Sequence, residues 1–280
     1  MRITDTFSKV ETMNVEDAKK LLAEKKEDEM ALIDVREPEE YKQGHIPGAR
    51  LIPLSDILDR LKELDPSKPA LAYCRMGNRS RSAAALMMTQ GFNKVYSIAG
   101  GITAWNGLVA TGEYETGMFL LEGKKTPEEF LSLAWALEEG TRLFYKQTGD
   151  IVLDERAKKI FALLVNAEEN HKAAISAAYK QFKGSGITDD KLKEMSLEGF
   201  MEGGVSIEES VSWLKQKDRK LQDILEYSMQ IETNSLDLYT KILRQMENEE
   251  AKKVFNAILD EEKVHLSRLG DLLNERIADE

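Results

Sequence analysis

The pattern of apolar and polar positions divides the chain into two parts with different periods. Up to about residue 107, short apolar runs alternate with polar stretches of helical spacing. The predicted strands are 31–35, 49–53, 69–74 and 95–100, and the predicted helices are 14–24, 38–44, 55–64 and 81–90. Short apolar strands that alternate with helices predict an α/β fold with a mostly parallel sheet.

Long helical patterns replace this alternation after segment 111–125, which has the composition of a linker. Thr126 and Pro127 predict a helix start, because threonine caps a first turn and proline suits its first position. The predicted long helices are 127–147, 154–182, 218–246 and 249–276, and 183–217 is a long connection with one short helix. We therefore predict two domains, an α/β domain at 1–117 and an all-α four-helix bundle at 118–280.

An internal repeat supports the bundle. Residues 155–171 match residues 249–265 at seven of seventeen positions with an offset of 94 residues, and both segments end in Glu-x-x-His. The same offset places Glu138 on Glu232 and Tyr145 on Tyr239. Two helix pairs joined by a long crossover account for this arrangement.

Composition and charge narrow the class of protein. The 280 residues are 42% hydrophobic and carry a net charge of −11, of which −2 lies in 1–117 and −9 in 118–280. An acidic chain without a polybasic run is a poor binder of nucleic acid or of an anionic membrane surface. The N-terminus lacks the apolar core of a signal peptide, and no apolar run reaches the roughly 18 residues of a membrane span. We expect a cytoplasmic protein that binds neither nucleic acid nor membrane.

The single cysteine, Cys74, ends a predicted apolar strand and precedes a predicted helix. Backbone N–H groups at such a position favour an anion, and Arg75, Arg79 and Arg81 add positive charge. Both effects predict a lowered pKa and a nucleophilic thiolate. The alternative is a buried structural cysteine, which is the commoner role of a free cysteine.

The first 110 residues resemble the rhodanese family. The matching segments are IDVREPEEY (33–41), GHIPGA (44–49), YCRMGNRS (73–80), GF (91–92) and GGITAW (100–105). The resemblance implies a thiosulfate-type sulfurtransferase in which Cys74 becomes a persulfide. Arg79 is the sixth loop residue counted from Cys74, which matches the sulfurtransferases rather than the related cell-cycle phosphatases, whose loop is one residue longer.

The resemblance also implies roles for the neighbouring residues. Arg75 and Arg79 would supply charge, and the loop would bind the donor through Met76, Gly77, Asn78 and Ser80. Asp34 and Arg36 would support the substrate region, although hydrogen bonding at the strand end is an equally good interpretation, and His45 would stabilise its turn. The expected donor is a small anionic sulfur compound. The acceptor is external, a thiol, cyanide or a protein partner, because the chain has no second cysteine. This domain needs no cofactor.

Two Glu-x-x-His pairs and two further glutamates form a candidate metal site in the second domain. Glutamate and histidine three residues apart share a helix face, so the two pairs can converge in a bundle core. Four carboxylates and two imidazoles suit a pair of iron or manganese ions better than zinc. A single Glu-x-x-His motif commonly lies on a solvated helix face, but here the histidine of each motif lies thirty-three residues after a glutamate of the preceding helix. The candidate ligands are Glu138, Glu168, His171, Glu232, Glu262 and His265.

Residues 127–277 resemble the ferritin-like superfamily and, within it, the rubrerythrin-like proteins, through EEGTRLFY (138–145) and ETNSLDLY (232–239). The resemblance implies a di-iron domain in which Glu138 and Glu232 are terminal ligands and Glu168 and Glu262 bridge the ions. Tyr145 and Tyr239 are assigned to packing or to support of the ligands. Glu139, Glu169 and Glu261 are assigned to the surface unless the metal site needs a further ligand. The four cysteines of a rubredoxin-like iron site are absent, which argues against NADH-linked peroxide reduction by this chain alone and makes an external electron donor a possible partner.

Three functions are compatible with these features. We favour a sulfurtransferase coupled to a di-iron module that handles an oxidant or a sulfur intermediate, and we expect a homodimer. The first alternative is a persulfide-sensing or metal-storing protein without rapid turnover. In the second, the bundle is only a dimerisation platform, and nothing about the protein depends on metal.

Overall fold

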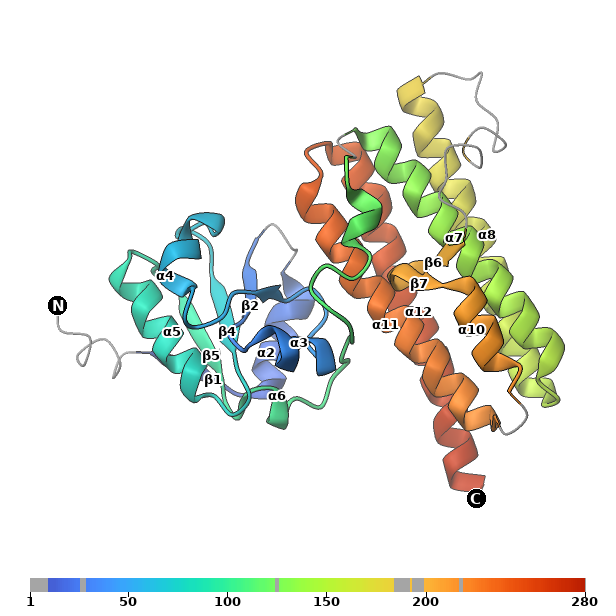
Figure 1. The fold of residues 1–280 in the computed structure, drawn as a ribbon, viewed down its shortest axis with the longest axis horizontal. Helices are drawn as coiled ribbons and strands as arrows, with labels where there is room; N and C mark the ends of the chain where they lie inside the picture. The colour runs from blue at the N-terminus through green and yellow to red at the C-terminus, as the bar shows by residue number, and fades with distance from the viewer. Residues whose placement is uncertain are drawn as a thin grey trace. The chain divides into compact units, whose positions relative to one another are not determined.

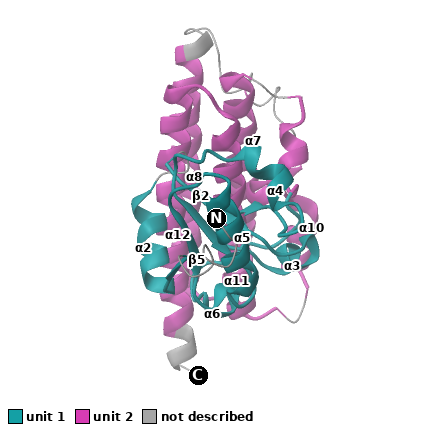
Figure 2. Ribbon diagram, turned by 90° about the vertical axis from the view of Figure 1, so that its left-hand side faces the viewer, with its two compact units in different colours: residues 1–114 teal, residues 115–280 magenta. Residues whose placement is uncertain are grey.

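The computed structural model describes residues 10–25, 29–123, 126–183, 192, 199–216 and 219–279. The chain forms two compact units, Met1–Tyr114 and Glu115–Glu280, coloured separately in Figure 2. The sequence placed the boundary three residues later, after Gly117, in the same linker. No helix in the described ranges is long and apolar enough to cross a membrane.

The first unit contains a five-stranded sheet in which every strand pair is parallel (Figure 1). Its strands are β1 (Glu11–Met13), β2 (Ala31–Asp34), β3 (Arg50–Leu51), β4 (Ala70–Tyr73) and β5 (Val95–Ile98), in the order β1-β5-β4-β2-β3. The parallel sheet of the α/β prediction is confirmed. The polar strand β1 at one edge was not predicted, because its three residues show no apolar run.

Helices cover both faces of this sheet. They are α2 (Val15–Glu24), α3 (Pro38–Gln43), α4 (Ile57–Arg60), the 3-10 turn η1 (Leu61–Glu63), α5 (Asn78–Thr89) and α6 (Gly101–Ala104). Neighbouring strand residues point to opposite faces. On β2, Leu32 packs in the cluster that contains Tyr41 of α3, whereas Ile33 packs in the cluster that contains Ile57 of α4 and Met87 of α5. The strands are therefore buried on both sides, as the continuous apolar runs predicted.

The second unit is the predicted bundle. A 3-10 turn, η2 (Met118–Leu121), precedes α7 (Pro127–Ile151) and α8 (Glu155–Lys183), and α11 (Leu221–Gln245) and α12 (Glu249–Asp279) follow the crossover. Helix α7 packs against α8, α11 against α12, and α12 against α8. The crossover holds β6 (Phe200–Met201), the 3-10 turn η3 (Glu202–Gly204), β7 (Val205–Ser206) and α10 (Ile207–Leu214). Only α10 was predicted there.

A buried polar layer divides the apolar core of the bundle into two clusters. On α7, Leu137 belongs to one cluster and Phe144 to the other, and Glu138 lies between them. On α12, Ile258 and Leu269 are similarly divided. The carboxylate layer, as we call it, consists of side chains at most 3% exposed: Glu138, Glu168, His171, Glu202, Glu232, Glu262 and His265.

Candidate functional site

The cysteine loop lies between β4 and α5, where the sequence placed it. Cys74 directly follows β4, and α5 begins at Asn78 after Gly77, whose φ of 97° is strained for other residues. Helix α6 also holds the loop in place, because the Ile102 amide donates a hydrogen bond to the Cys74 carbonyl at 2.8 Å. A Cβ on Gly101 would lie 2.1 Å from that carbonyl oxygen, so only glycine allows this close approach.

The Cys74 sulfur lies among hydrogen-bond donors. The Gly77 amide donates to Sγ at 3.1 Å, and the Ser80 hydroxyl lies 3.7 Å from it and 2.7 Å from the Ser97 hydroxyl. Burial favours the neutral thiol, but hydrogen bonds from Ser80, Met76 and Gly77 outweigh it and lower the pKa of Cys74. A hydrogen-bonded thiolate at a helix N-terminus can act as a nucleophile.

The other predicted loop residues divide into exposed and paired groups. Arg75, Met76 and Asn78 are exposed around the sulfur. Arg79 donates through Nη1 and Nη2 to the Glu40 carboxylate of α3, at 2.7 Å each. This pairing lowers the pKa of Glu40 to about 2 and was not predicted. It holds the Arg79 charge beside the loop.

Asp34 and Arg36 form a buried pair. The Arg36 guanidinium donates to Asp34 Oδ2 at 2.6 Å and to the Gly44 carbonyl at 2.6 Å. Within the described residues, no hydrogen bond joins either side chain to the Cys74 loop. Their contacts support the strand-end interpretation. His45 stacks on Tyr41 with ring centroids 3.6 Å apart, which suits the expected role in its turn.

The lowered pKa of Cys74 has a measurable consequence. Alkylation by iodoacetamide requires the thiolate, so its rate should reach half-maximum at a pH below the ordinary thiol value of about 8.5. Ser80→Ala removes a hydroxyl donor and should move the midpoint upward. Because the chain has one cysteine, the rate reports on Cys74 alone. A wild-type midpoint at or above the ordinary value would contradict the hydrogen-bond argument.

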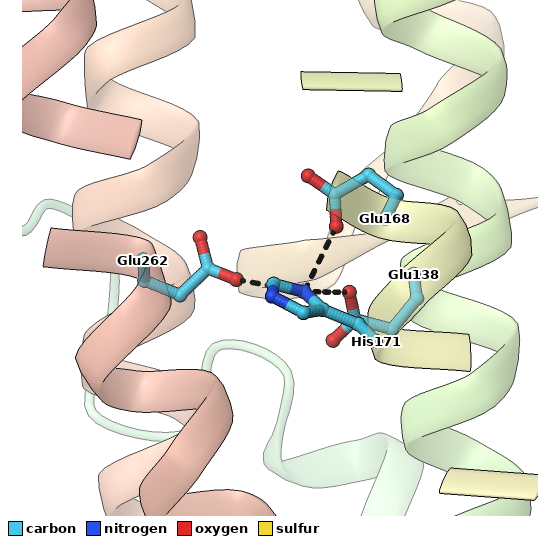
Figure 3. A group of neighbouring side chains, drawn as sticks. All are labelled: Glu138, Glu168, His171 and Glu262. Atoms are coloured by element: carbon cyan, nitrogen blue, oxygen red, sulfur yellow. Dashed lines mark hydrogen bonds and ion pairs between the residues drawn. The ribbon is translucent and has the colours of Figure 1, made fainter. Parts of the chain in front are cut away.

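The carboxylate layer brings all six predicted metal ligands together from four helices. Figure 3 shows three glutamates pointing at one imidazole. The His171 Nδ1 atom lies 2.9 Å from Glu138, 3.2 Å from Glu168 and 3.5 Å from Glu262. Two groups have ligand atoms within 4.8 Å of one another, and Glu168 belongs to both: Glu138, Glu168, His171 and Glu262; and Glu168, Glu232 and His265.

Two tyrosines connect the helix pairs through this layer. Tyr239 of α11 donates to Glu138 of α7 at 2.6 Å, and Tyr145 of α7 donates to Glu232 of α11. Each phenol therefore orients the glutamate of the opposite pair. This is the supporting role that the sequence allowed for these residues.

The charge of the layer fits a pair of metal ions. Burial and neighbouring carboxylates raise the pKa values of Glu168, Glu202 and Glu262 well above the usual range. Burial favours a neutral His171, but Glu138 and other acids raise its pKa to about 9. Both Glu168 oxygens and one oxygen of Glu262 are buried with no hydrogen-bond partner among the described residues. Metal ions would supply the missing partners and positive charge.

Sequence reasoning missed Glu202 and correctly placed Glu261 at the surface. Glu202 of the crossover forms a third group with Glu232 and Glu262, again within 4.8 Å. It shows no helical spacing, and its only sequence signal is a charge between Met201 and two glycines. Glu261 is 58% exposed at its side chain, as expected, yet its Oε2 lies 3.1 Å from His171 Nε2. The other two glutamates that adjoin predicted ligands in the sequence are Glu139 and Glu169. They pair with Arg142 and Lys172 outside the layer.

The fold and the two sites define a fusion of a rhodanese-type α/β domain with a ferritin-like bundle. Residues 14–108 match the family model of the rhodanese-like domain, and residues 129–273 match that of rubrerythrin. The chain belongs to the rubrerythrin family and carries a rhodanese-like domain before its rubrerythrin domain. The rubrerythrin domain implies a di-iron site.

Named relatives match the first domain. The thiosulfate sulfurtransferase GlpE of Pseudomonas paraeruginosa is 35% identical over 117 residues, which cover 40% of this chain and 100% of the relative. GlpE of Pseudomonas putida is 38% identical over 81 residues, which cover 29% of this chain and 74% of the relative. An uncharacterised protein of Bacillus subtilis, YqhL, is 44% identical over 78 residues, which cover 28% of this chain and 62% of the relative. The chain therefore spans less than two thirds of that protein's length.

Proposed function

We propose that the protein is a sulfurtransferase that carries sulfane sulfur on Cys74. The observation that carries this proposal is the contact of the Cys74 sulfur with the Gly77 amide at the start of α5, which favours the thiolate. The similarity to two thiosulfate sulfurtransferases supports the same chemistry.

Sulfur transfer proceeds in two displacements. The Cys74 thiolate attacks the outer sulfur of thiosulfate, a bond forms between the two sulfurs, and sulfite leaves with the electron pair of the broken S–S bond. A cyanide ion or a thiolate acceptor then attacks the terminal sulfur of the persulfide. The Cys74 thiolate leaves and is regenerated, so no external oxidant or reductant is consumed.

The loop residues bind and orient the reactants in this scheme. The Gly77 amide and the Ser80 hydroxyl stabilise the thiolate before attack and after release. Exposed Arg75 and the guanidinium of Arg79 attract the anionic donor. Glu40 holds Arg79 in place, so it is a positioning residue rather than a catalytic one.

In the second domain, we propose that the carboxylate layer holds two iron or manganese ions. Glu138, Glu168, His171 and Glu262 would hold one, and Glu168, Glu232 and His265 the other; Glu262, which also lies within 4.8 Å of Glu232, would contribute to both. Such ions supply redox and Lewis-acid chemistry for a small oxidant or a sulfur compound. Tyr145 and Tyr239 orient the terminal carboxylates, and the apolar clusters exclude water from above and below.

Mass spectrometry of the intact protein tests the persulfide. Incubation with thiosulfate should add one sulfur atom to the chain, and cyanide should remove it. The added mass should map to the peptide that contains Cys74. No added sulfur after incubation with excess thiosulfate would contradict the proposed carrier role.

A further inference from the structure

The crossover carries a carboxylate into the metal centre. Glu202 opens the turn η3, is fully buried, and has an oxygen within 4.8 Å of ligand atoms of Glu232 and Glu262. The crossover packs on α7 and α11, the two helices that carry Glu138 and Glu232. This segment therefore does more than connect the two helix pairs.

Two glycines allow the crossover to reach this depth. A Cβ on Gly140 of α7 would lie 2.3 Å from the Phe200 carbonyl oxygen, so a larger residue there would push β6 away. Gly203 has a φ of 70°, and a Cβ on it would lie 2.7 Å from Cβ of Asn234. The backbone on both sides of Glu202 thus depends on close contacts that only glycine permits.

Polar contacts fix Glu202 but leave one of its oxygens without a partner. The Thr141 hydroxyl accepts from the Glu202 amide at 3.1 Å, and the Ser235 hydroxyl donates to Oε1 at 2.9 Å. The Oε2 atom is buried and has no hydrogen-bond partner among the described residues. An oriented carboxylate oxygen without a partner, beside two candidate ligands, is suited to bind a cation.

The repeat gives Glu202 no counterpart in the other half of the bundle. The offset of 94 residues relates the other candidate ligands in pairs, but it takes position 202 to Leu108 in the first unit. Glu202 groups with Glu232 and Glu262, and not with Glu138 and His171. Its carboxylate is therefore an addition to the repeat-related pairs of ligands, and its ligand atom is grouped with those on the Glu232 side.

We propose that Glu202 is a fifth carboxylate ligand of the metal pair, that it binds only the ion held by Glu232 and His265, and that it makes this ion the more tightly bound. The inference rests on the proposed metal centre. Metal affinity rises with the number of charged oxygen ligands, so one added carboxylate should separate two otherwise similar sites.

Titration of the chelator-treated full chain with Mn²⁺ tests this inference by calorimetry. The wild type should bind two ions in steps separated by at least about tenfold in Kd. In Glu202→Gln, the tighter step should weaken by about tenfold or more, and the weaker step should change by less than about threefold. The matched control is Glu139→Gln, because Glu139 is a half-buried neighbour of the site that pairs with Arg142 and Lys172. It should leave both steps unchanged.

The other outcomes are distinct. Equal weakening of both steps in Glu202→Gln, or no change in either, would overturn the role of Glu202 while the metal pair stands. Absence of binding of both Mn²⁺ and, in an anaerobic titration, Fe²⁺ by the wild type would overturn the metal pair and the role of Glu202 with it. Circular dichroism shows whether Glu202→Gln folds. If it does not, the wild-type titration decides, because two binding steps of equal Kd would contradict the proposal that one ion is bound more tightly.

Discussion

Replacement of Cys74 by serine should lower thiosulfate:cyanide sulfur transfer by a factor of at least about 10³. A serine hydroxyl is not ionised near neutral pH and forms no persulfide, so both displacements lose their nucleophile. The substitution is nearly isosteric, and the Gly77 amide can donate to the new oxygen as it does to sulfur. The fold should therefore be retained. Thiocyanate formation measures the effect.

The metal content provides the control for this substitution. Cys74→Ser should leave the amount of bound metal unchanged, because all proposed ligands lie in the second unit. A variant that folds, binds metal and keeps more than about a tenth of the activity would contradict the assignment of Cys74 as sulfur carrier.

Replacement of Glu168 by alanine should remove both metal ions. Glu168 is the residue shared by the two ligand groups around His171 and His265, and both of its oxygens are buried without hydrogen-bond partners in the described structure. Wild-type protein purified without chelators should contain about two iron or manganese ions per chain, and Glu168→Ala fewer than about half an ion. Elemental analysis measures both.

The adjacent residue supplies a matched control. Glu169 is half-exposed and pairs with Arg142 and Lys172, so Glu169→Ala should retain both ions. Chelation of the wild type should lower the Tm of the bundle by roughly 5–10 °C, since ligand at a hundred times its Kd contributes about 2.7 kcal/mol. The chelator should not shift the Tm of Glu168→Ala. Two ions retained in Glu168→Ala would refute the shared-ligand role.

Much of both sites was predictable because their residues follow regular elements. Cys74 ends an apolar strand, and the histidines follow glutamates at helical spacing, so periodicity alone placed them on common faces. Helix α5 starts at Asn78, three residues before the predicted start, because polar residues fill its first turn beside the loop. The composition of residues 78–80 is typical of a loop, and only Gly77 before them marks the start of the helix.

The contacts between distant segments were not predictable from periodicity. Arg79 pairs with Glu40, which lies thirty-nine residues earlier. Glu202 is in a crossover without helical period, and its position depends on Gly140 in another element. Tertiary packing determines which distant residues come into contact, and the local sequence pattern around each residue does not reveal these contacts. For the same reason, Glu261 reads as a surface residue although it contacts His171.

The two apolar clusters bound the candidate metal centre along the helix axis. Because they close the bundle above and below the carboxylate layer, travel along the helix axis would require large side chains such as Phe144 and Phe255 to move. The layer instead meets the exposed surface sideways, where His171 contacts half-exposed Glu261 between α8 and α12. On this flank, a half-exposed carboxylate is therefore in direct contact with a candidate metal ligand, so a negative charge lies between the layer and the solvent.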